Sequence, residues 1–422
     1  MSFNTISVVG LGYIGLPTAA MFASRKIKVI GVDVNQHAVD TINRGEIHIV
    51  EPDLDMIVHA AVTEGNLKAT TTPEPADAFL IAVPTPFKNN DSEIPEPDLS
   101  YIKKASEAIA PVLKKGDLVI LESTSPVGAT EQMAVWLAAA RPDLTFPGPE
   151  SSYTDTNIDV NVAHCPERVL PGHVVRELVE NDRVIGGITA KCSARSVELY
   201  KTFVQGECVI TNARTAEMAK LTENSCRDVQ IAFANELSII CDKLDIDVWE
   251  LISLANRHPR INILQPGPGV GGHCIAVDPW FIVSKTPEQA QIIHTARKVN
   301  DAKPQWVINK VKLAIADFLQ ANPTKTVQDV TVACYGLAFK PDIDDLRESP
   351  ALNITKKIAA LHLGSVIAIE PNIQKSTIEC IKCVTVAEAK ESADIHIILV
   401  KHEKFKKIQK TEFTLDLVGL LL

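Results

Sequence analysis

The sequence predicts an α/β fold in which two domains with parallel sheets are joined by a central helical domain. Three observations predict it. Apolar strands alternate with helical segments in the first part of the chain, and the same alternation returns after residue 322. Between them lies a section with the three- and four-residue periodicity of long helices. We place the domains at residues 1–210, 211–316 and 317–422.

The first domain is justified by its strands and the helices between them. Residues 6–10 are an apolar run, small residues at 18–24 favour a helix, and 28–33 form a second strand. Further buried strands are expected at 78–83 and 118–122, with a helix at 99–113. Strands that alternate with helices predict a parallel sheet covered on both faces, the Rossmann-like plan.

The middle and the end of the chain differ in pattern. From 214 to 255 apolar residues recur at helical spacing, and long helices of this kind often form a subunit interface. A loop rich in glycine and proline follows at 266–279, and then a helix around 290–300. Strands at 330–336, 365–370 and 394–400 and a helix at 350–361 predict a second Rossmann-like domain.

Composition narrows the classes of function. The 422 residues are 46% hydrophobic and 22% charged, as in a soluble globular protein. A net charge of −10 and only 5% aromatic residues argue against a nucleic-acid partner. We see neither a secretory signal nor an apolar run of the ~18 residues needed to span a bilayer, so we expect a cytoplasmic protein without membrane insertion. The nine cysteines fit a reducing compartment, and Cys380 and Cys383 lack the second pair of a metal site, so no metal is expected.

The glycine pattern after the first strand predicts a dinucleotide site. Gly10, Gly12 and Gly15 stand between a strand and a helix, the context that a GxGxxG match requires. Asp33 ends the second strand, where a carboxylate bonds the adenosine ribose and repels a 2′-phosphate. The pattern therefore favours NAD over NADP, and a glycine turn without a ligand is the weaker interpretation.

Two more loops end strands of the same sheet. Pro84 and Thr85 follow one buried strand, and Ser123 and Thr124 follow another. Ligands of open α/β sheets bind at the carboxyl ends of the strands, so these loops are expected at the same crevice. The predicted cofactor-binding set within the first domain is Gly10, Gly12, Tyr13, Ile14, Gly15, Asp33, Pro84, Thr85, Ser123 and Thr124.

Cys274 is the candidate nucleophile. A lone cysteine is more often an apolar filler of the core. Here the thiol follows a run of glycines that would allow close approach of ligands, and Asp278 lies four residues later. A thiolate is a strong nucleophile and a good leaving group, so it can trap an aldehyde and release an acid.

Four segments together resemble the UDP-glucose/GDP-mannose dehydrogenase family, over essentially the whole chain. They are the loop around Cys274, Lys220–Asn224, Cys165–Arg168 and residues 336–350. The resemblance implies oxidation of a sugar C6 alcohol to a carboxylate with reduction of two NAD. It also implies a UDP-sugar substrate and assembly with itself as a homodimer or larger oligomer.

The resemblance also implies roles for single residues. The catalytic set is Cys274, Lys220, Asn224, Asp278, Glu167 and Thr124. The substrate-binding set is Glu167, Arg168, Val169, Lys220, Asn224, Arg227, His258, Arg260, Gly271, Phe339 and Lys340. Arg260 is expected to reach the site of a second subunit, and Arg347 is expected to reach NAD.

The identity of the sugar rests on two further segments. Within the family, residues 256–266 and 271–281 most resemble members that oxidise UDP-N-acetyl-D-mannosamine, and this resemblance implies an acid product for bacterial surface polysaccharide such as enterobacterial common antigen. UDP-N-acetylglucosamine and UDP-glucose remain alternatives. So do a simple two-electron alcohol dehydrogenase and a non-catalytic sensor of NAD or nucleotide sugars.

Overall fold

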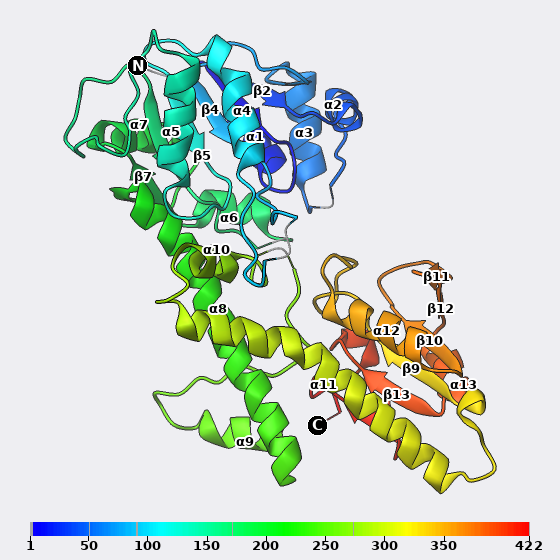
Figure 1. Ribbon diagram of the computed structural model, residues 1–422. Coiled ribbons are helices and arrows are strands. Elements are labelled where there is room, and N and C mark those ends of the chain that lie inside the picture. The colour runs from blue at the N-terminus through cyan, green and yellow to red at the C-terminus, as the bar shows by residue number, and fades with distance from the viewer. Residues whose placement is uncertain (1–2, 50, 90–91, 171, 273, 422) are drawn as a thin grey trace. The chain divides into compact units, whose positions relative to one another are not determined.

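The computed structural model describes residues 3–49, 51–89, 92–170, 172–272 and 274–421. The chain divides into two compact units, Met1–Glu223 and Asn224–Leu422. Each unit contains one sheet flanked by helices (Figure 1). No helix of the described ranges is both long enough and apolar enough to cross a bilayer.

The first unit is built on a sheet with the strand order β3-β2-β1-β4-β5-β6-β7-β8. Its strands are β1 (Thr5–Val9), β2 (Lys28–Val32), β3 (Leu67–Thr70), β4 (Ala78–Ile81), β5 (Leu118–Leu121), β6 (Asn161–His164), β7 (Arg183–Gly187) and β8 (Cys208–Asn212). All neighbours are parallel except β6 and β7, a departure from the fully parallel sheet expected from the sequence. Ala163 and His164 at the end of β6 pair with Gly187 and Gly186 at the end of β7, so β7 begins beyond the carboxyl end of β6 and runs back toward it.

Helices cover both faces of this sheet (Figure 1). They are α1 (Gly15–Ser24), α2 (Gln36–Asn43), α3 (Leu54–Thr63), α4 (Ser100–Ile109), α5 (Ala129–Ala140), α6 (Val174–Glu180) and α7 (Ala190–Tyr200), with a 3₁₀ turn at Ala110–Val112. One core includes Phe22 of α1 and Val58 of α3. The other includes Ile102 of α4 and Met133 of α5. The strand order reverses between β1 and β4, which is where open α/β sheets bind their ligands.

The predicted helical section is formed by α8 (Ala213–Leu244), α9 (Val248–Ala255), α10 (Asp278–Lys285) and α11 (Gln291–Ala321). Helix α8 begins in the first unit and ends in the second. Asp245 has φ +54° after α8, and the side chain of Asp247 caps α9, so two helices replace one continuous pattern. Helix α11 runs far beyond the expected 290–300 in spite of Pro304. Apolar residues such as Val307 and Val311 continue its buried face, and this packing offsets the hydrogen bond that proline cannot make.

The second unit ends in a smaller sheet with the order β11-β12-β10-β9-β13-β14. Its elements are β9 (Thr331–Tyr335), α12 (Pro350–Leu361), β10 (Ser365–Ile369), β11 (Thr377–Ile378), β12 (Ile381–Cys383), α13 (Val386–Ser392), β13 (Ile395–Ile398) and β14 (Thr414–Asp416), with 3₁₀ turns at Val327–Asp329 and Glu403–Phe405. Only the hairpin β11–β12 is antiparallel among these described strands. The order β9, α12, β10 repeats the order β1, α1, β2 of the first unit, so the fold class predicted from the sequence is confirmed.

Candidate active site

The glycine loop between β1 and α1 has the shape that a dinucleotide needs. Gly10 has φ +93°, and a Cβ there would lie 2.6 Å from the carbonyl oxygen of Ala82. A Cβ on Gly15 would lie 1.7 Å from the carbonyl oxygen of Gly10, so helix and strand meet without room for a side chain. A Cβ on Gly12 would enter open space within the described structure. The loop is therefore closed on its inner side and open where a pyrophosphate would approach.

Asp33 closes the same site from the end of β2. Its Oδ2 accepts a hydrogen bond from the backbone N–H of Leu11 (2.8 Å), and its Oδ1 accepts one from Asn35 (2.8 Å). The carboxylate is partly exposed, as are Tyr13 and Ile14 at the start of α1. These contacts fix an anionic acceptor beside the glycine loop, where it fits an adenosine ribose and opposes a 2′-phosphate.

The loops after β4 and β5 lie at the neighbouring strand ends. Pro84 is exposed, and the buried Oγ1 of Thr85 has no hydrogen-bond partner among the described residues. Ser123 turns inward and donates from Oγ to the carbonyl oxygen of Ile81 (3.2 Å), while Thr124 is partly exposed. The unpartnered hydroxyl of Thr85 and the open side of the glycine loop both fit a bound dinucleotide.

The segment after β6 places Glu167 in a buried position. Its Oε2 accepts from Nη2 of Arg183 (2.7 Å), and its Oε1 accepts from the backbone N–H of Arg168 (2.8 Å). The Arg168 guanidinium is paired with Glu223 of α8 (2.6 Å), so in this structure it is engaged by protein rather than free for a diphosphate. Val169 packs partly buried against the core beneath.

A buried polar cluster that sequence reasoning missed supports Glu167. Arg183 opens β7, lies over the ring of Tyr200 (4.6 Å) and stands 3.9 Å from Glu122, whose Oε1 accepts from the Tyr200 hydroxyl (2.5 Å). Burial raises the pKa of Glu122 to about 7, and it raises the pKa of the neighbouring Cys165 thiol to about 12. The only signal in the sequence is an arginine at the start of an otherwise apolar strand.

Helix α8 carries Lys220 and Asn224 one turn apart, as predicted. Asn224 donates from Nδ2 to Oδ2 of Asp278 (2.5 Å), which is buried at the start of α10. The backbone N–H of Asp278 donates to the carbonyl oxygen of Cys274 (2.9 Å). The structure therefore brings Asn224, Asp278 and the exposed Cys274 together in the second unit, and Lys220 is partly exposed on the part of α8 that belongs to the first.

The loop that carries the thiol packs against the end of β9. A Cβ on Gly271 would lie 2.5 Å from the carbonyl oxygen of Glu348, and one on Gly272 would lie 3.2 Å from the ring of Phe339. Backbone therefore contacts backbone and ring at a separation that only glycine permits.

Two cations accompany this contact. Lys340 follows Phe339 in the chain, and its ammonium interacts electrostatically with Arg227 and Cys274. Lys340 is exposed, and partial desolvation together with the positive charge of Arg227 lowers its pKa, while Cys274 opposes this shift. Of the predicted substrate residues, Gly271 and Phe339 thus belong to one packing contact, and Lys340 interacts electrostatically with both Arg227 and Cys274.

Three other predicted residues of the second unit are engaged by groups close to them in the chain. His258 and Arg260 are exposed on the segment after α9, and the backbone N–H of Arg260 donates to Nδ1 of His258 (3.4 Å). The guanidinium of Arg347 is held by Asp345 through Nε and Nη2. Among the described residues, no three His, Cys, Asp or Glu side chains are grouped so that they could hold a metal ion.

A doubly wound sheet with an open glycine loop and an acid directly after its second strand fits the class of dinucleotide-dependent dehydrogenases. Residues 4–204 match the NAD binding domain of the UDP-glucose/GDP-mannose dehydrogenase family, residues 214–302 match its central domain, and residues 333–420 match its UDP binding domain. The chain belongs to this family and is an NAD-dependent oxidoreductase.

Individual relatives agree with this assignment. The chain is 63% identical to UDP-N-acetyl-D-mannosamine dehydrogenase of Yersinia pestis over 100% of both chains. It is 62% identical to NDP-N-acetyl-D-galactosaminuronic acid dehydrogenase of Ralstonia nicotianae, over 97% of this chain and 93% of the relative. The solved UDP-D-ManNAc dehydrogenase of Pyrococcus horikoshii matches with a TM-score of 0.85 and 36% identity. The match covers 99% of this chain and 96% of the solved chain.

Proposed function

We propose that the protein oxidises the C6 alcohol of UDP-N-acetyl-D-mannosamine to the carboxylate, with a thiohemiacetal and a thioester on Cys274 as intermediates. The observation that carries the four-electron chemistry is the exposed thiol of Cys274, which interacts electrostatically with Lys340 and lies four residues before Asp278 of the Asn224–Asp278 pair. The relatives named for this substrate carry the choice of sugar. We place the reaction in the cytoplasm, as a step toward a surface polysaccharide such as enterobacterial common antigen.

Lys220, Asn224 and Cys274 have separate roles in the two oxidations. NAD, when bound, accepts a hydride in each of the two oxidations. Lys220 takes the proton of the alcohol or stabilises the alkoxide, and Asn224 orients the oxygen. The Cys274 sulfur attacks the aldehyde carbon to form a C–S bond, which breaks again when water attacks the thioester.

The water for hydrolysis needs an acceptor for its proton. Asp278, Glu167 and Thr124 are the groups that we assign to organise it. Asp278 is buried and held by Asn224, and Glu167 is buried and held by Arg183, so both carboxylates have fixed positions. A fixed acceptor loses less entropy in the reaction than a mobile one.

NAD is held by the residues predicted from the sequence, Gly10, Gly12, Tyr13, Ile14, Gly15, Asp33, Pro84, Thr85, Ser123, Thr124 and Arg347. The sugar nucleotide is held by Arg168, Val169, Arg227, His258, Arg260, Gly271, Phe339 and Lys340. We keep the division into a NAD domain (1–210), a helical domain (211–316) and a nucleotide-sugar domain (317–422).

A second sugar is favoured by one comparison. The Ralstonia relative is named for an N-acetylgalactosaminuronic acid and is almost as similar to this chain as the Yersinia relative. UDP-N-acetyl-D-galactosamine is therefore the second candidate substrate, ahead of UDP-N-acetylglucosamine and UDP-glucose.

The test is the number of NADH formed per limiting UDP-N-acetyl-D-mannosamine, with NAD in excess. Two NADH per sugar are expected, and Cys274→Ser should form acid at least about a hundredfold more slowly. One NADH per sugar would reject the four-electron mechanism. Turnover only with UDP-N-acetyl-D-galactosamine would reject the choice of sugar, and NAD binding without any turnover would favour a sensor.

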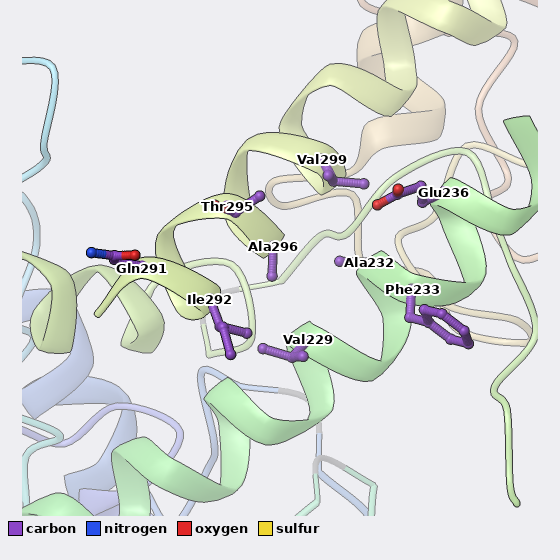
Figure 2. Close-up of a pocket in the computed structure, with 9 residues that line it drawn as sticks. All are labelled: Val229, Ala232, Phe233, Glu236, Gln291, Ile292, Thr295, Ala296 and Val299. Atoms are coloured by element: carbon purple, nitrogen blue, oxygen red, sulfur yellow. The ribbon is translucent and has the colours of Figure 1, made fainter. Parts of the chain in front are cut away.

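We also propose a homodimer formed through the helical section. Phe233, Ile240 and Leu244 are 53%, 44% and 61% exposed along one stripe of α8. Figure 2 shows a groove beside this stripe in which Val229 and Ala232 of α8 face Ile292 and Ala296 of α11. Exposed apolar side chains in such a row are typical of a subunit interface.

The oligomeric state tests the dimer. Phe233→Glu should shift the protein to a monomer in size-exclusion chromatography with light scattering. Leu363→Glu is the matched control, because Leu363 is 74% exposed but lies outside the helical section. A wild-type protein that is monomeric at micromolar concentration would reject the dimer, and an unchanged dimer in Phe233→Glu would reject this surface.

A further inference from the structure

Two buried side chains outside the assigned site hold the loop of Phe339 and Lys340 in place. Glu370 directly follows β10, and His402 follows β13; both side chains have 0% exposure. Oε2 of Glu370 accepts from the backbone N–H groups of Leu337 (2.8 Å) and Ala338 (3.0 Å). It also lies 3.2 Å from Nε2 of His402.

The contacts of His402 fix its tautomer. Nδ1 lies 2.9 Å from the backbone N–H of Asp342, which can only donate, so Nδ1 is the acceptor. The proton of the neutral ring is then on Nε2, which donates to Glu370. The Glu370–His402 pair therefore binds the loop at Leu337 and Ala338 on one side and at Asp342 on the other.

Phe339 and Lys340 lie between these anchors. The ring of Phe339 contacts the backbone at Gly272, and the ammonium of Lys340 interacts with the Cys274 thiol. Both residues thus meet the catalytic loop from a segment whose backbone is fixed on either side by one buried pair.

The equivalent acid of the first unit is used differently. Asp33 also follows the second strand of its βαβ unit and accepts from a loop N–H, but it stays partly exposed beside the cofactor loop. Glu370 is longer by one methylene, turns inward and accepts from two loop N–H groups and an imidazole. Asp33 is thus the acid that we assign to ribose binding in the first unit, whereas the equivalent Glu370 is buried and bonds to groups of its own domain.

We propose that Glu370 and His402 are positioning residues that hold Lys340 and Phe339 against the loop of Cys274 and thereby set the reactivity of the thiol. This inference rests on the proposed roles of Cys274 and Lys340. A cation beside a thiol favours the thiolate, which is the nucleophile. Loss of the pair should release Lys340 from this position and slow every reaction of Cys274.

The test is the rate of alkylation of Cys274 by iodoacetamide in the full-length protein without substrate, followed by peptide mass spectrometry. His402→Ala and Glu370→Gln should each slow it by about threefold or more, as should Lys340→Met. The exposed thiols of Cys226 and Cys380 serve as internal references in the same sample. This readout does not depend on which sugar the enzyme oxidises, so it separates this inference from the proposed substrate.

A matched variant distinguishes positioning from general loosening. His396 is also a buried imidazole of this domain, but its ring is bonded to the Tyr335 hydroxyl (2.9 Å) and not to a backbone group of residues 337–342. His396→Ala should leave the rate at Cys274 unchanged, and Lys340→Met combined with His402→Ala should be no slower than either alone.

Three outcomes would overturn the inference. The first is an unchanged alkylation rate of Cys274 in folded Glu370→Gln and His402→Ala. The second is a decrease in this rate in His396→Ala as large as that in His402→Ala. The third is additivity of the effects of Lys340→Met and His402→Ala on this rate.

Discussion

Replacement of Glu122 by Gln tests the buried cluster beneath the proposed site. The Glu122 side chain has 0% exposure, and burial raises its pKa to about 7 from an ordinary value of 4.5. The folded protein therefore holds this proton over a pH range in which the unfolded chain has released it. The contribution to stability is fully present below about pH 4.5 and is lost as the pH rises through 7.

The magnitude follows from the two pKa values. Their difference corresponds to roughly 3 kcal/mol, of which about 2.5 kcal/mol falls between pH 5 and pH 8. Glutamine keeps an oxygen that can accept from the Tyr200 hydroxyl but has no proton to lose. Wild type should therefore lose about 2.5 kcal/mol relative to Glu122→Gln over this interval.

Urea unfolding of both proteins at about pH 5 and about pH 8 measures the difference. Glu107→Gln, at an exposed position of α4, controls for the general effect of removing a carboxylate. A difference between wild type and Glu122→Gln that stays constant within about 0.5 kcal/mol would refute the reasoning, because it would mean that Glu122 does not titrate near 7.

Three further outcomes are expected. Gly15→Ala should abolish NAD binding measured by calorimetry, because its Cβ would lie 1.7 Å from the Gly10 carbonyl oxygen. Gly12→Ala should fold and bind NAD more weakly than wild type, since a Cβ there enters open space. Equal NAD affinities of the two variants would contradict the loop geometry. Asp33→Asn should weaken NAD binding about tenfold and reduce the preference of the enzyme for NAD over NADP. An unchanged ratio of the KM for NAD to the KM for NADP would contradict the predicted contact of Asp33 with the ribose. Burial lowers the pKa of Lys303 to about 8 from 10.5. In urea unfolding, the free energy of unfolding of wild type should therefore rise by about 2 kcal/mol relative to that of Lys303→Met between about pH 7.5 and 9.5. An unchanged difference would show that burial does not disfavour the charged form of this lysine.

Local patterns explain which parts of the fold and the site could be predicted. The glycine loop, Asp33 and the strands around them depend on short-range rules of backbone conformation and alternation, and the structure has them where the sequence placed them. The reversed strand β7 and the extension of α11 past Pro304 were missed, because both depend on packing partners distant in the chain.

The sequence by itself determined the class of protein, since the residues that we predict to bind phosphate, ribose and aldehyde lie in short motifs. Only the tertiary structure decided which distant groups support them. Arg183 reaches Glu167 from another strand, and Glu370 and His402 meet across 32 positions to fix the loop of Lys340. The partners of a buried ionic group cannot be predicted from the local sequence, because they depend on which strands and loops lie side by side in the folded sheet and not on the neighbours in the chain.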